Sequence, residues 1–253
     1  MNDGQNFTIK EAFNLAVQYH QNNNLQDAQN YYQKVLKIDP NHSFALSNVG
    51  LIFSKSGENQ KAKDCYEKAI EINPNYADAH YNLGVLFKEL GEREKAKDCY
   101  EKAIKINPNF ANALNNLGNI FNELGENQKA RDCYEKAIEI NPNYVDAHNN
   151  LGVIFNKSGE NEKAKDCYEK AIEINPNYAD AHYNLGVLFK ELGENEKAKD
   201  CYEKAIEIDP LNKKNQAAYG HMLLSLNENL KGYEYITKGE GVIKFTPSNY
   251  KII

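Results

Sequence analysis

The sequence predicts an all-α fold, a solenoid of six stacked helix hairpins followed by a C-terminal capping helix. Three observations predict it: a period of 34 residues, two apolar stripes with helical spacing in each period, and an Asn-Pro or Asp-Pro turn that closes each period. The prolines that mark the period are Pro40, Pro74, Pro108, Pro142, Pro176 and Pro210. Repeats of this length are typical of stacked architectures rather than of a single globular core.

The six units run 9–42, 43–76, 77–110, 111–144, 145–178 and 179–212. Units 77–110 and 179–212 agree at 29 of 34 positions. The first apolar stripe of unit 77–110 consists of Ala79, Leu83, Leu86, Phe87 and Leu90. Its spacing of three and four residues predicts a first helix, and Gly91 stands where a helix end favours a residue without a Cβ.

A second stripe in the same unit predicts a second helix. It consists of Ala96, Cys99, Tyr100, Ala103, Ile104 and Ile106. The Asn-Pro turn at Pro108 ends it, because proline cannot continue a helix and disfavours helix in the residue before it. One such hairpin cannot bury its own apolar face, so we expect the hairpins to stack.

The composition of the chain limits the classes of partner that we expect it to bind. The net charge is −6, with acidic and basic residues mixed along the chain, whereas a nucleic-acid-binding surface needs a basic stripe. No apolar run approaches the roughly 20 residues that span a bilayer. Residues 1–10 are polar and lack the apolar core of a signal peptide. We therefore expect a cytoplasmic protein that contacts neither nucleic acid nor membrane.

No catalytic, cofactor or metal-binding pattern is present, and we expect none of these activities. The five cysteines, Cys65, Cys99, Cys133, Cys167 and Cys201, are each 34 residues apart. They occupy the same place in successive repeats, too far apart for disulfides, so we expect half-buried thiols in a reducing compartment. His80, His148 and His182 are one or two repeats apart and do not form a metal-ligand set.

The unit resembles the tetratricopeptide repeat (TPR), over about residues 9–212. The small residue of the first helix is Ala16, Gly50, Gly84, Gly118, Gly152 and Gly186. The alanine that opens the second helix is Ala28, Ala62, Ala96, Ala130, Ala164 and Ala198, and the aromatic that follows it is Tyr32, Tyr66, Tyr100, Tyr134, Tyr168 and Tyr202. Where the family often has Trp, this chain has Ala12, Leu46, His80, Leu114, His148 and His182. We expect the tyrosines to be buried between helices.

The resemblance implies a right-handed superhelix whose first helices line a concave groove where ligands bind. The residue two before the small hallmark residue is asparagine in all six units: Asn14, Asn48, Asn82, Asn116, Asn150 and Asn184. This line resembles the asparagine ladder in the TPR region of O-linked N-acetylglucosamine transferase, which holds target chains by their backbone. An amide suits that role because it offers both a donor and an acceptor. The alternative is that these asparagines bond to neighbouring helices and are copied by duplication, and both interpretations stay open.

Further groove positions complete the expected peptide-binding site. They are Tyr81, Asn115, Asn119, Asn149 and Tyr183. This amide-rich groove favours recognition of a peptide backbone over recognition of one charged motif. Each amide hydrogen bond contributes about 0.5–1.5 kcal/mol net, which implies micromolar affinity for a flexible peptide.

The two ends depart from the period. Residues 1–8 are expected to form an N-terminal tail and 213–238 a capping region, with helices over about 213–226 and 229–237. Gly239-Glu240-Gly241 is expected to break the second of these. The apolar tail 239–253 either folds back on the last helices or is the edge of a following domain.

The predicted function is a non-catalytic scaffold that binds a protein or peptide ligand in its groove. One alternative is the substrate-targeting region of a larger enzyme, of glycosyltransferase or oxygenase type, whose catalytic domain is absent from this chain. Another is a self-assembling scaffold that forms homo-oligomers through the C-terminal tail or the solenoid ends. The identity of the partner does not follow from the sequence.

Overall fold

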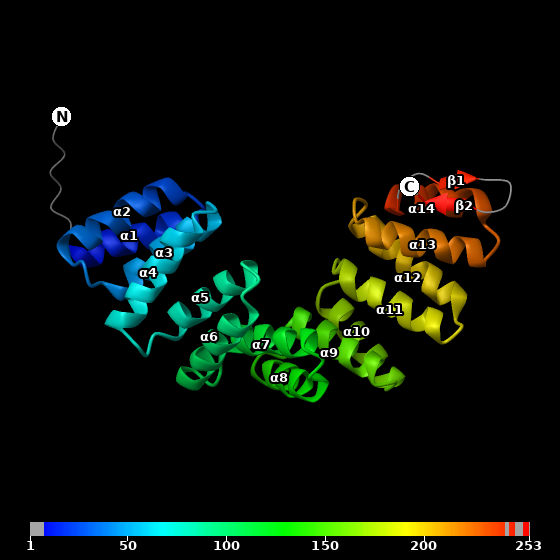
Figure 1. The fold of residues 1–253 in the computed structure, drawn as a ribbon, viewed down its shortest axis with the longest axis horizontal. Coiled ribbons are helices and arrows are strands. Elements are labelled where there is room, and N and C mark those ends of the chain that lie inside the picture. Colours follow the sequence, from blue (N-terminus) through cyan, green and yellow to red (C-terminus); the bar gives the residue numbers. More distant parts are fainter. Residues whose placement is uncertain (1–7, 241–242, 246–249, 253) are drawn as a thin grey trace. The chain divides into compact units, whose positions relative to one another are not determined.

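The computed structural model describes residues 8–240, 243–245 and 250–252, and within them it contains fourteen helices and two short strands (Figure 1). The helices are α1 Ile9–Gln21, α2 Leu25–Ile38, α3 Ser43–Lys55, α4 Asn59–Ile72, α5 Ala77–Glu89, α6 Arg93–Ile106, α7 Ala111–Glu123, α8 Asn127–Ile140, α9 Val145–Lys157, α10 Asn161–Ile174, α11 Ala179–Glu191, α12 Asn195–Ile208, α13 Lys213–Ser225 and α14 Asn229–Glu240. Each of the six predicted units therefore contains two helices, and a seventh hairpin, α13–α14, follows them.

The strands are β1 Ile243–Phe245 and β2 Tyr250–Ile252, which pair antiparallel with Ile243 opposite Ile252. They lie in the apolar tail, for which the all-α prediction contained no strand. Of the predicted N-terminal tail only Thr8 is described, and it caps α1 through its side chain and through Glu11.

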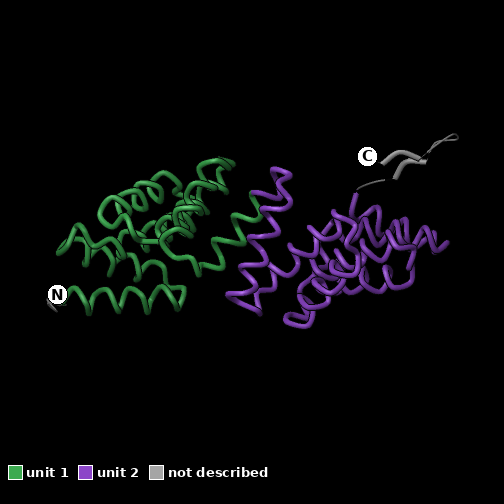
Figure 2. The backbone as a smooth tube through the Cα atoms, turned by 90° about the horizontal axis from the view of Figure 1, so that it is seen from below, with its two compact units in different colours: residues 1–120 green, residues 121–253 purple. Residues whose placement is uncertain are grey.

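The chain divides into two compact units, unit 1 with residues 1–120 and unit 2 with residues 121–253 (Figure 2). From here on the 34-residue units are called repeats. Within unit 1 the two helices of each repeat pack on each other, and α2 and α4 pack on the first helix of the next repeat, α3 and α5. Unit 2 follows the same rule, with α8 on α9, α10 on α11 and α12 on α13. In both units first helices also touch directly, α3 with α5 and α9 with α11. The expected helical stacking is thus present inside each unit.

The glycine after the first helix forms the predicted helix end. Gly91 has a φ of +78°, and the next backbone N–H, of Glu92, donates to the carbonyl of Phe87 at 2.8 Å. This left-handed turn is accessible to glycine without a steric penalty, and it satisfies a carbonyl at the end of α5. Gly57, Gly125, Gly159 and Gly193 have the same conformation.

The tyrosine of the second helix is the largest side chain in the core of each repeat. Tyr100, Tyr134 and Tyr168 are all buried, which confirms the prediction. The small residue of the first helix makes room for this ring, so that the two helices of a hairpin lie close together.

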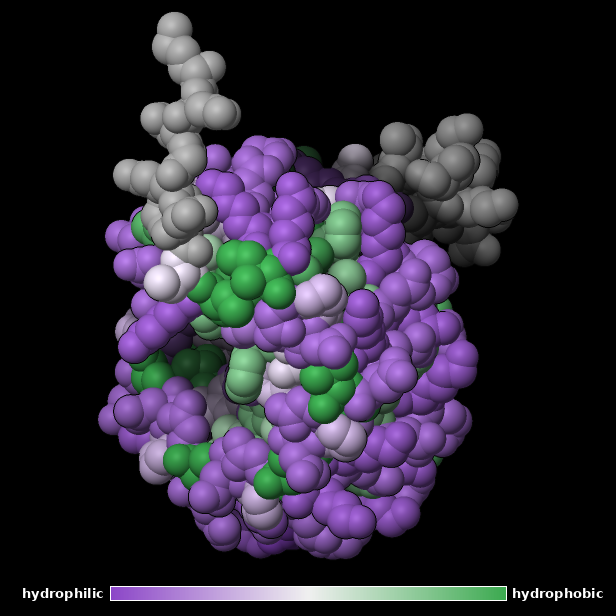
Figure 3. All heavy atoms as spheres, turned by 90° about the vertical axis from the view of Figure 1, so that its left-hand side faces the viewer, coloured by the Kyte–Doolittle hydropathy of each residue, from purple (hydrophilic) through white to green (hydrophobic). Residues whose placement is uncertain are grey.

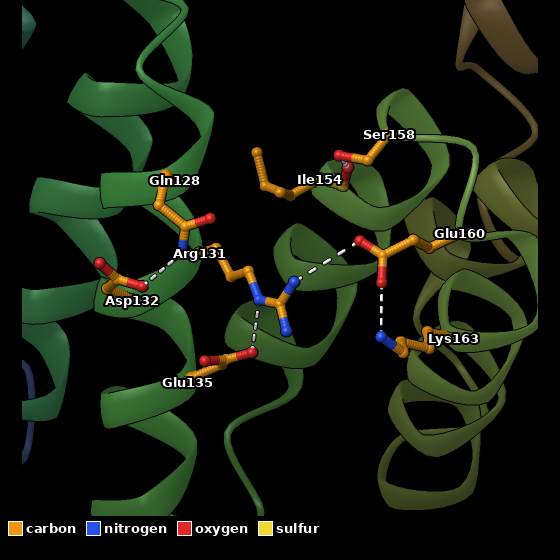
Figure 4. A network of polar contacts seen from close by, with 8 residues as sticks. All are labelled: Gln128, Arg131, Asp132, Glu135, Ile154, Ser158, Glu160 and Lys163. Atoms are coloured by element: carbon orange, nitrogen blue, oxygen red, sulfur yellow. Dashed lines mark hydrogen bonds and ion pairs between the residues drawn. The ribbon is translucent and has the colours of Figure 1, made fainter.

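Ion pairs join successive repeats of unit 2. Arg131 on α8 donates through Nε to Glu135, 2.8 Å away, and through Nη1 to Glu160, 3.5 Å away, while Glu160 also accepts from Lys163 (Figure 4). The Arg131 guanidinium lies 4.8 Å from the centre of the Phe155 ring. Lys199 makes the equivalent pair with Glu228 of the cap.

The capping hairpin corrects one prediction. Gly239 does not break the last helix, because α14 continues to Glu240. A Cβ on Gly239 would lie 2.6 Å from the backbone N of Ala217 and from the carbonyl of Lys213. Gly239 therefore permits close packing of α14 on α13, and it stays helical because that packing compensates for the low helix propensity of glycine.

Candidate functional site

The structure places the predicted line of asparagines on the first helices α1, α3, α5, α7, α9 and α11. Asn14 is exposed, and the other five, Asn48, Asn82, Asn116, Asn150 and Asn184, are half-buried. Each belongs to a first helix at the same place in its repeat. We call these six residues the ladder asparagines, and within each compact unit they occupy the same place in every repeat.

Three of these amides bond to the preceding repeat. Asn82 Nδ2 donates to Ser47 Oγ at 3.5 Å, Asn116 Nδ2 to Tyr81 Oη at 3.3 Å, and Asn184 Nδ2 to Asn149 Oδ1 at 2.9 Å. Each bond connects a first helix to the first helix of the preceding repeat. The asparagines thus support the stack, while remaining partly accessible to a ligand.

The bonds leave part of two of these amides unused. Among the described residues, the Oδ1 atoms of Asn82 and Asn184 accept no hydrogen bond, and one of the two protons on each Nδ2 has no partner. One acceptor and one donor therefore remain on each side chain. This is the pair of groups that an extended peptide backbone can bond.

Two predicted groove residues are not on the surface. Asn115 and Asn149 are only 4% and 5% exposed. Asn149 accepts the amide of Asn184, so its place is in the contact between repeats rather than in a ligand contact. The prediction that these two line the groove needs correction, because their side chains are enclosed by the packing of successive repeats. Tyr81, Asn119 and Tyr183 are half-buried and stay candidates.

The two candidate tyrosines are neutral hydrogen-bonding groups. Burial raises the pKa of both Tyr81 and Tyr183, and the bond from Asn116 opposes that rise at Tyr81. At neutral pH both phenols therefore keep their protons. Tyr81 accepts from Asn116, whereas Tyr183 faces the cap, where Lys214 Nζ lies 4.0 Å from the centre of its ring.

A pocket lies beside the capping hairpin. Ala217 and Ala218 of α13 occupy the two repeat positions that are Tyr183 and Asn184 in the sixth repeat. Together with Tyr183 and other residues of α11, Tyr202 of α12 and further residues of α13, they line a pocket of about 560 Å³. His221 and Glu240, 2.7 Å apart, form part of its wall.

Unit 1 contains a feature that sequence reasoning missed, a row of four aromatic rings. Phe13 lies 4.9 Å from His42, His42 lies 6.2 Å from Phe44, and Phe44 lies 4.7 Å from Tyr76, all between ring centres. We call Phe13, His42, Phe44 and Tyr76 the aromatic strip. The available signal was Phe44, which replaces the aspartate found at this position in three other repeats.

At the end of the molecule that carries the N-terminal helices, hydrophobic residues form separate patches within a mainly hydrophilic surface (Figure 3). Phe44 is 48% exposed, so about half of its ring surface is available to a ligand. Such an exposed ring on a first helix is a candidate ligand contact.

Among the described residues, no three histidine, cysteine or acidic side chains lie together as metal ligands. No helix in the described part of the chain is both long and apolar enough to cross a membrane. Burial raises the pKa of the Cys99 and Cys201 thiols to about 11 and that of Cys167 to about 12, so these thiols stay protonated and weakly nucleophilic.

Family models match most of the repeat region. Models described as TPR repeat match residues 50–91, 118–159 and 153–193, and models described as tetratricopeptide repeat match 9–42, 77–110, 99–132 and 179–212. No curated protein matches the chain.

Solved structures show the same fold. A tetratricopeptide-repeat protein from Parabacteroides merdae superposes with a TM-score of 0.70 at 20% identity, over 95% of this chain and 94% of that one. YrrB, described as a TPR protein with an unusual peptide-binding site, gives 0.60 at 25% identity, over 78% of this chain and 97% of its own. MamA gives 0.56 at 29% identity, over 65% of this chain and 96% of its own.

Proposed function

This chain belongs to the tetratricopeptide-repeat family, and from that premise we propose that it is a non-catalytic scaffold that binds an extended segment of another protein along its first helices. Repeats of this family indicate a protein–protein interaction scaffold. The finer proposal is that the ladder asparagines hold the backbone of the ligand.

One observation carries the proposal. A half-buried asparagine recurs at the same place in five of the six repeats, and Asn82 and Asn184 each keep an unused acceptor and an unused donor proton after bonding to the preceding repeat. The bond to the preceding repeat fixes the orientation of the amide, which reduces the entropy lost when a ligand binds. A row of such amides pairs with peptide groups whatever the side chains of the ligand are.

The proposed ligand-contacting residues are the ladder Asn14, Asn48, Asn82, Asn116, Asn150 and Asn184 together with Tyr81, Asn119 and Tyr183. YrrB, which has a similar fold, is described as having a peptide-binding site, and this supports the same class of ligand here. Only hydrogen bonds of about 0.5–1.5 kcal/mol each are available from the amides, so we expect micromolar affinity.

The test compares two triple variants in affinity purification from cell extract, followed by binding measurements with each purified partner. One variant carries Asn82→Ala, Asn116→Ala and Asn150→Ala. The matched control carries Asn75→Ala, Asn109→Ala and Asn143→Ala, three exposed asparagines that recur with the same period in the turns between repeats. Loss of a partner only with the ladder variant is the expected result.

The ladder variant also loses bonds between repeats, so its folding must be monitored. Thermal unfolding of both variants therefore accompanies the binding measurement. If the ladder variant is unfolded, Val85→Glu and Val187→Glu, on half-buried positions of the first helices, replace it. Partners bound equally by wild type and a folded ladder variant would contradict the proposal.

A further inference from the structure

We propose that the groove of unit 1 prefers a proline-rich segment in the polyproline II conformation that carries a basic residue. This inference rests on the proposed function and adds the conformation and composition of the ligand. It follows from three features of unit 1: the aromatic strip, the distance between successive first helices, and an acidic side chain beside the strip.

The aromatic strip offers ring surface that the corresponding part of unit 2 does not. In unit 2 the hydroxyl of Tyr178 donates to Asp146 at 2.7 Å. The same two positions of the repeat in unit 1 are Tyr76 and Phe44, whose rings contact each other and make no such bond. The exposed Phe44 ring therefore provides an apolar contact where unit 2 has a carboxylate. Grooves lined by aromatic rings bind proline-rich segments in several peptide-recognition domains.

The repeat distance matches one conformation of an extended ligand. The first helices α3 and α5 are in contact, and contacting helix axes lie roughly 8–10 Å apart. A polyproline II helix has three residues per turn and a rise of about 3.1 Å, so the same face recurs about every 9 Å. A β-strand presents the same face every two residues, or about every 6.6 Å, and this distance does not match the spacing of the first helices. Of these two conformations, the polyproline II helix is the one that presents the same face to each successive repeat.

The hydrogen-bonding groups next to the strip fit a proline-rich backbone. Such a chain has no internal hydrogen bonds, and its prolines offer carbonyl acceptors but no N–H donors. Asn82 Nδ2 retains a proton after its bond to Ser47. That proton is the donor that a carbonyl-rich ligand requires.

An unpaired carboxylate gives the site its charge preference. Asp78 is exposed in the first turn of α5, two residues after Tyr76, and makes no ion pair with any described residue. Besides burial, its charge contributes to raising the pKa of Tyr76, because the two groups are close. A lysine or arginine of the ligand would therefore find an opposite charge at the edge of the aromatic strip.

The test uses two fluorescent mixtures of twelve-residue peptides and measures binding by anisotropy. In the first mixture proline is fixed at every third position, and in the second alanine takes those positions. Both carry one arginine at the same place and equal randomisation elsewhere. We expect the proline mixture to bind wild type at least tenfold more tightly than the alanine mixture.

Variants of Phe44 and Asp78 test whether the peptides bind at the aromatic strip. Phe44→Asp introduces the residue that three other repeats carry at this position, so we expect it to fold, and it should weaken binding of the proline mixture at least tenfold. Phe44→Ala is a second variant that adds no charge. The matched control is Leu230→Asp, on an exposed apolar residue of α14. Asp78→Asn should weaken binding several-fold at low ionic strength and have little effect at high ionic strength, where the charge is screened.

The outcomes separate this inference from the proposed function. Equal binding of both mixtures, lost in the ladder variant, would overturn the polyproline II preference and leave the proposed function intact. Binding that survives both Phe44 variants would overturn the assignment to the aromatic strip. No binding of either mixture would overturn the inference, whereas the proposed function would still be decided by the partners that the ladder variant loses.

Discussion

A Cβ on Gly152 would lie 2.6 Å from Cε1 of Tyr168, a distance that real Cβ contacts essentially never show. Gly84 and Tyr100 have the same relationship at 2.7 Å. Tyr168 is only 1% exposed, so its ring has no free space into which to move. The glycine of the first helix and the tyrosine of the second are therefore one packing unit, with the ring in contact with the helix backbone.

We therefore expect Gly152→Ala to destabilise the protein by about 1–3 kcal/mol, the usual cost of overpacking a core. The measurement is urea unfolding followed by circular dichroism. The double variant Gly152→Ala with Tyr168→Leu tests the mechanism, because a smaller partner relieves the clash. Its cost should be clearly less than the sum of the two single costs; strict additivity would show that the helices move apart instead.

The bond between Asn184 and Asn149 predicts a difference between two similar substitutions. Asn184→Ala removes a 2.9 Å hydrogen bond between repeats and leaves the nearly buried Asn149 without that donor. We expect a loss of about 0.5–1.5 kcal/mol in the free energy of unfolding. Asn48→Ala is the matched control, since the corresponding residue of its preceding repeat is Phe13, which has no acceptor. Equal effects of both substitutions would contradict a structural role for the bond.

The contacts of Arg131 predict a salt-dependent stabilisation of unit 2. Arg131→Ala removes bonds to Glu135 and Glu160 and the contact with the Phe155 ring. Because the group is partly exposed, we expect a loss of about 1 kcal/mol that becomes smaller in high salt. Lys165→Ala is the control, since Lys165 stands at the same repeat position but pairs at 3.9 Å with Glu169 of its own helix. Chemical unfolding at low and high ionic strength gives both values.

The hairpins could be predicted from sequence because their boundaries depend on local chemistry. Pro108 cannot continue a helix, and Gly91 adopts a φ that other residues avoid, so both ends are visible in the residues themselves. The burial of Tyr100 follows from the period. A position that is apolar in every copy must face the contact that every copy makes.

The rest depends on contacts between elements that no local pattern encodes. Gly239 has the signature of a helix breaker, yet the backbone of α13 at Ala217 lies so close that only glycine fits there. Asn115 and Asn149 have the composition of groove residues, but the packing of successive repeats encloses them. The aromatic strip joins residues from two successive repeats, and only the stacking of those repeats brings Phe13, His42 and Tyr76 into one row.

The half-buried His20 predicts how stability changes with pH. It lies in the last turn of α1, with its ring centre 6.1 Å from that of Tyr32. Burial, and then the charge of Lys55, hold the pKa of His20 below its ordinary value of 6.5. The unfolded chain therefore binds a proton at a higher pH than the folded chain does. Between the two pKa values the unfolded state holds more protons, so the free energy of unfolding must fall as the pH is lowered through about 6.5.

We expect the Tm of the wild type to decrease from pH 7.5 to pH 5.5 through this group, and the decrease to level off below the folded-state pKa. In His20→Gln, which cannot titrate, the decrease should be smaller over the same interval. Thermal unfolding of both proteins at matched ionic strength measures the difference. Since a like charge contributes to the shift, Lys55→Gln should also reduce the pH dependence. Parallel pH profiles for wild type and His20→Gln would show that protonation of His20 is not coupled to folding.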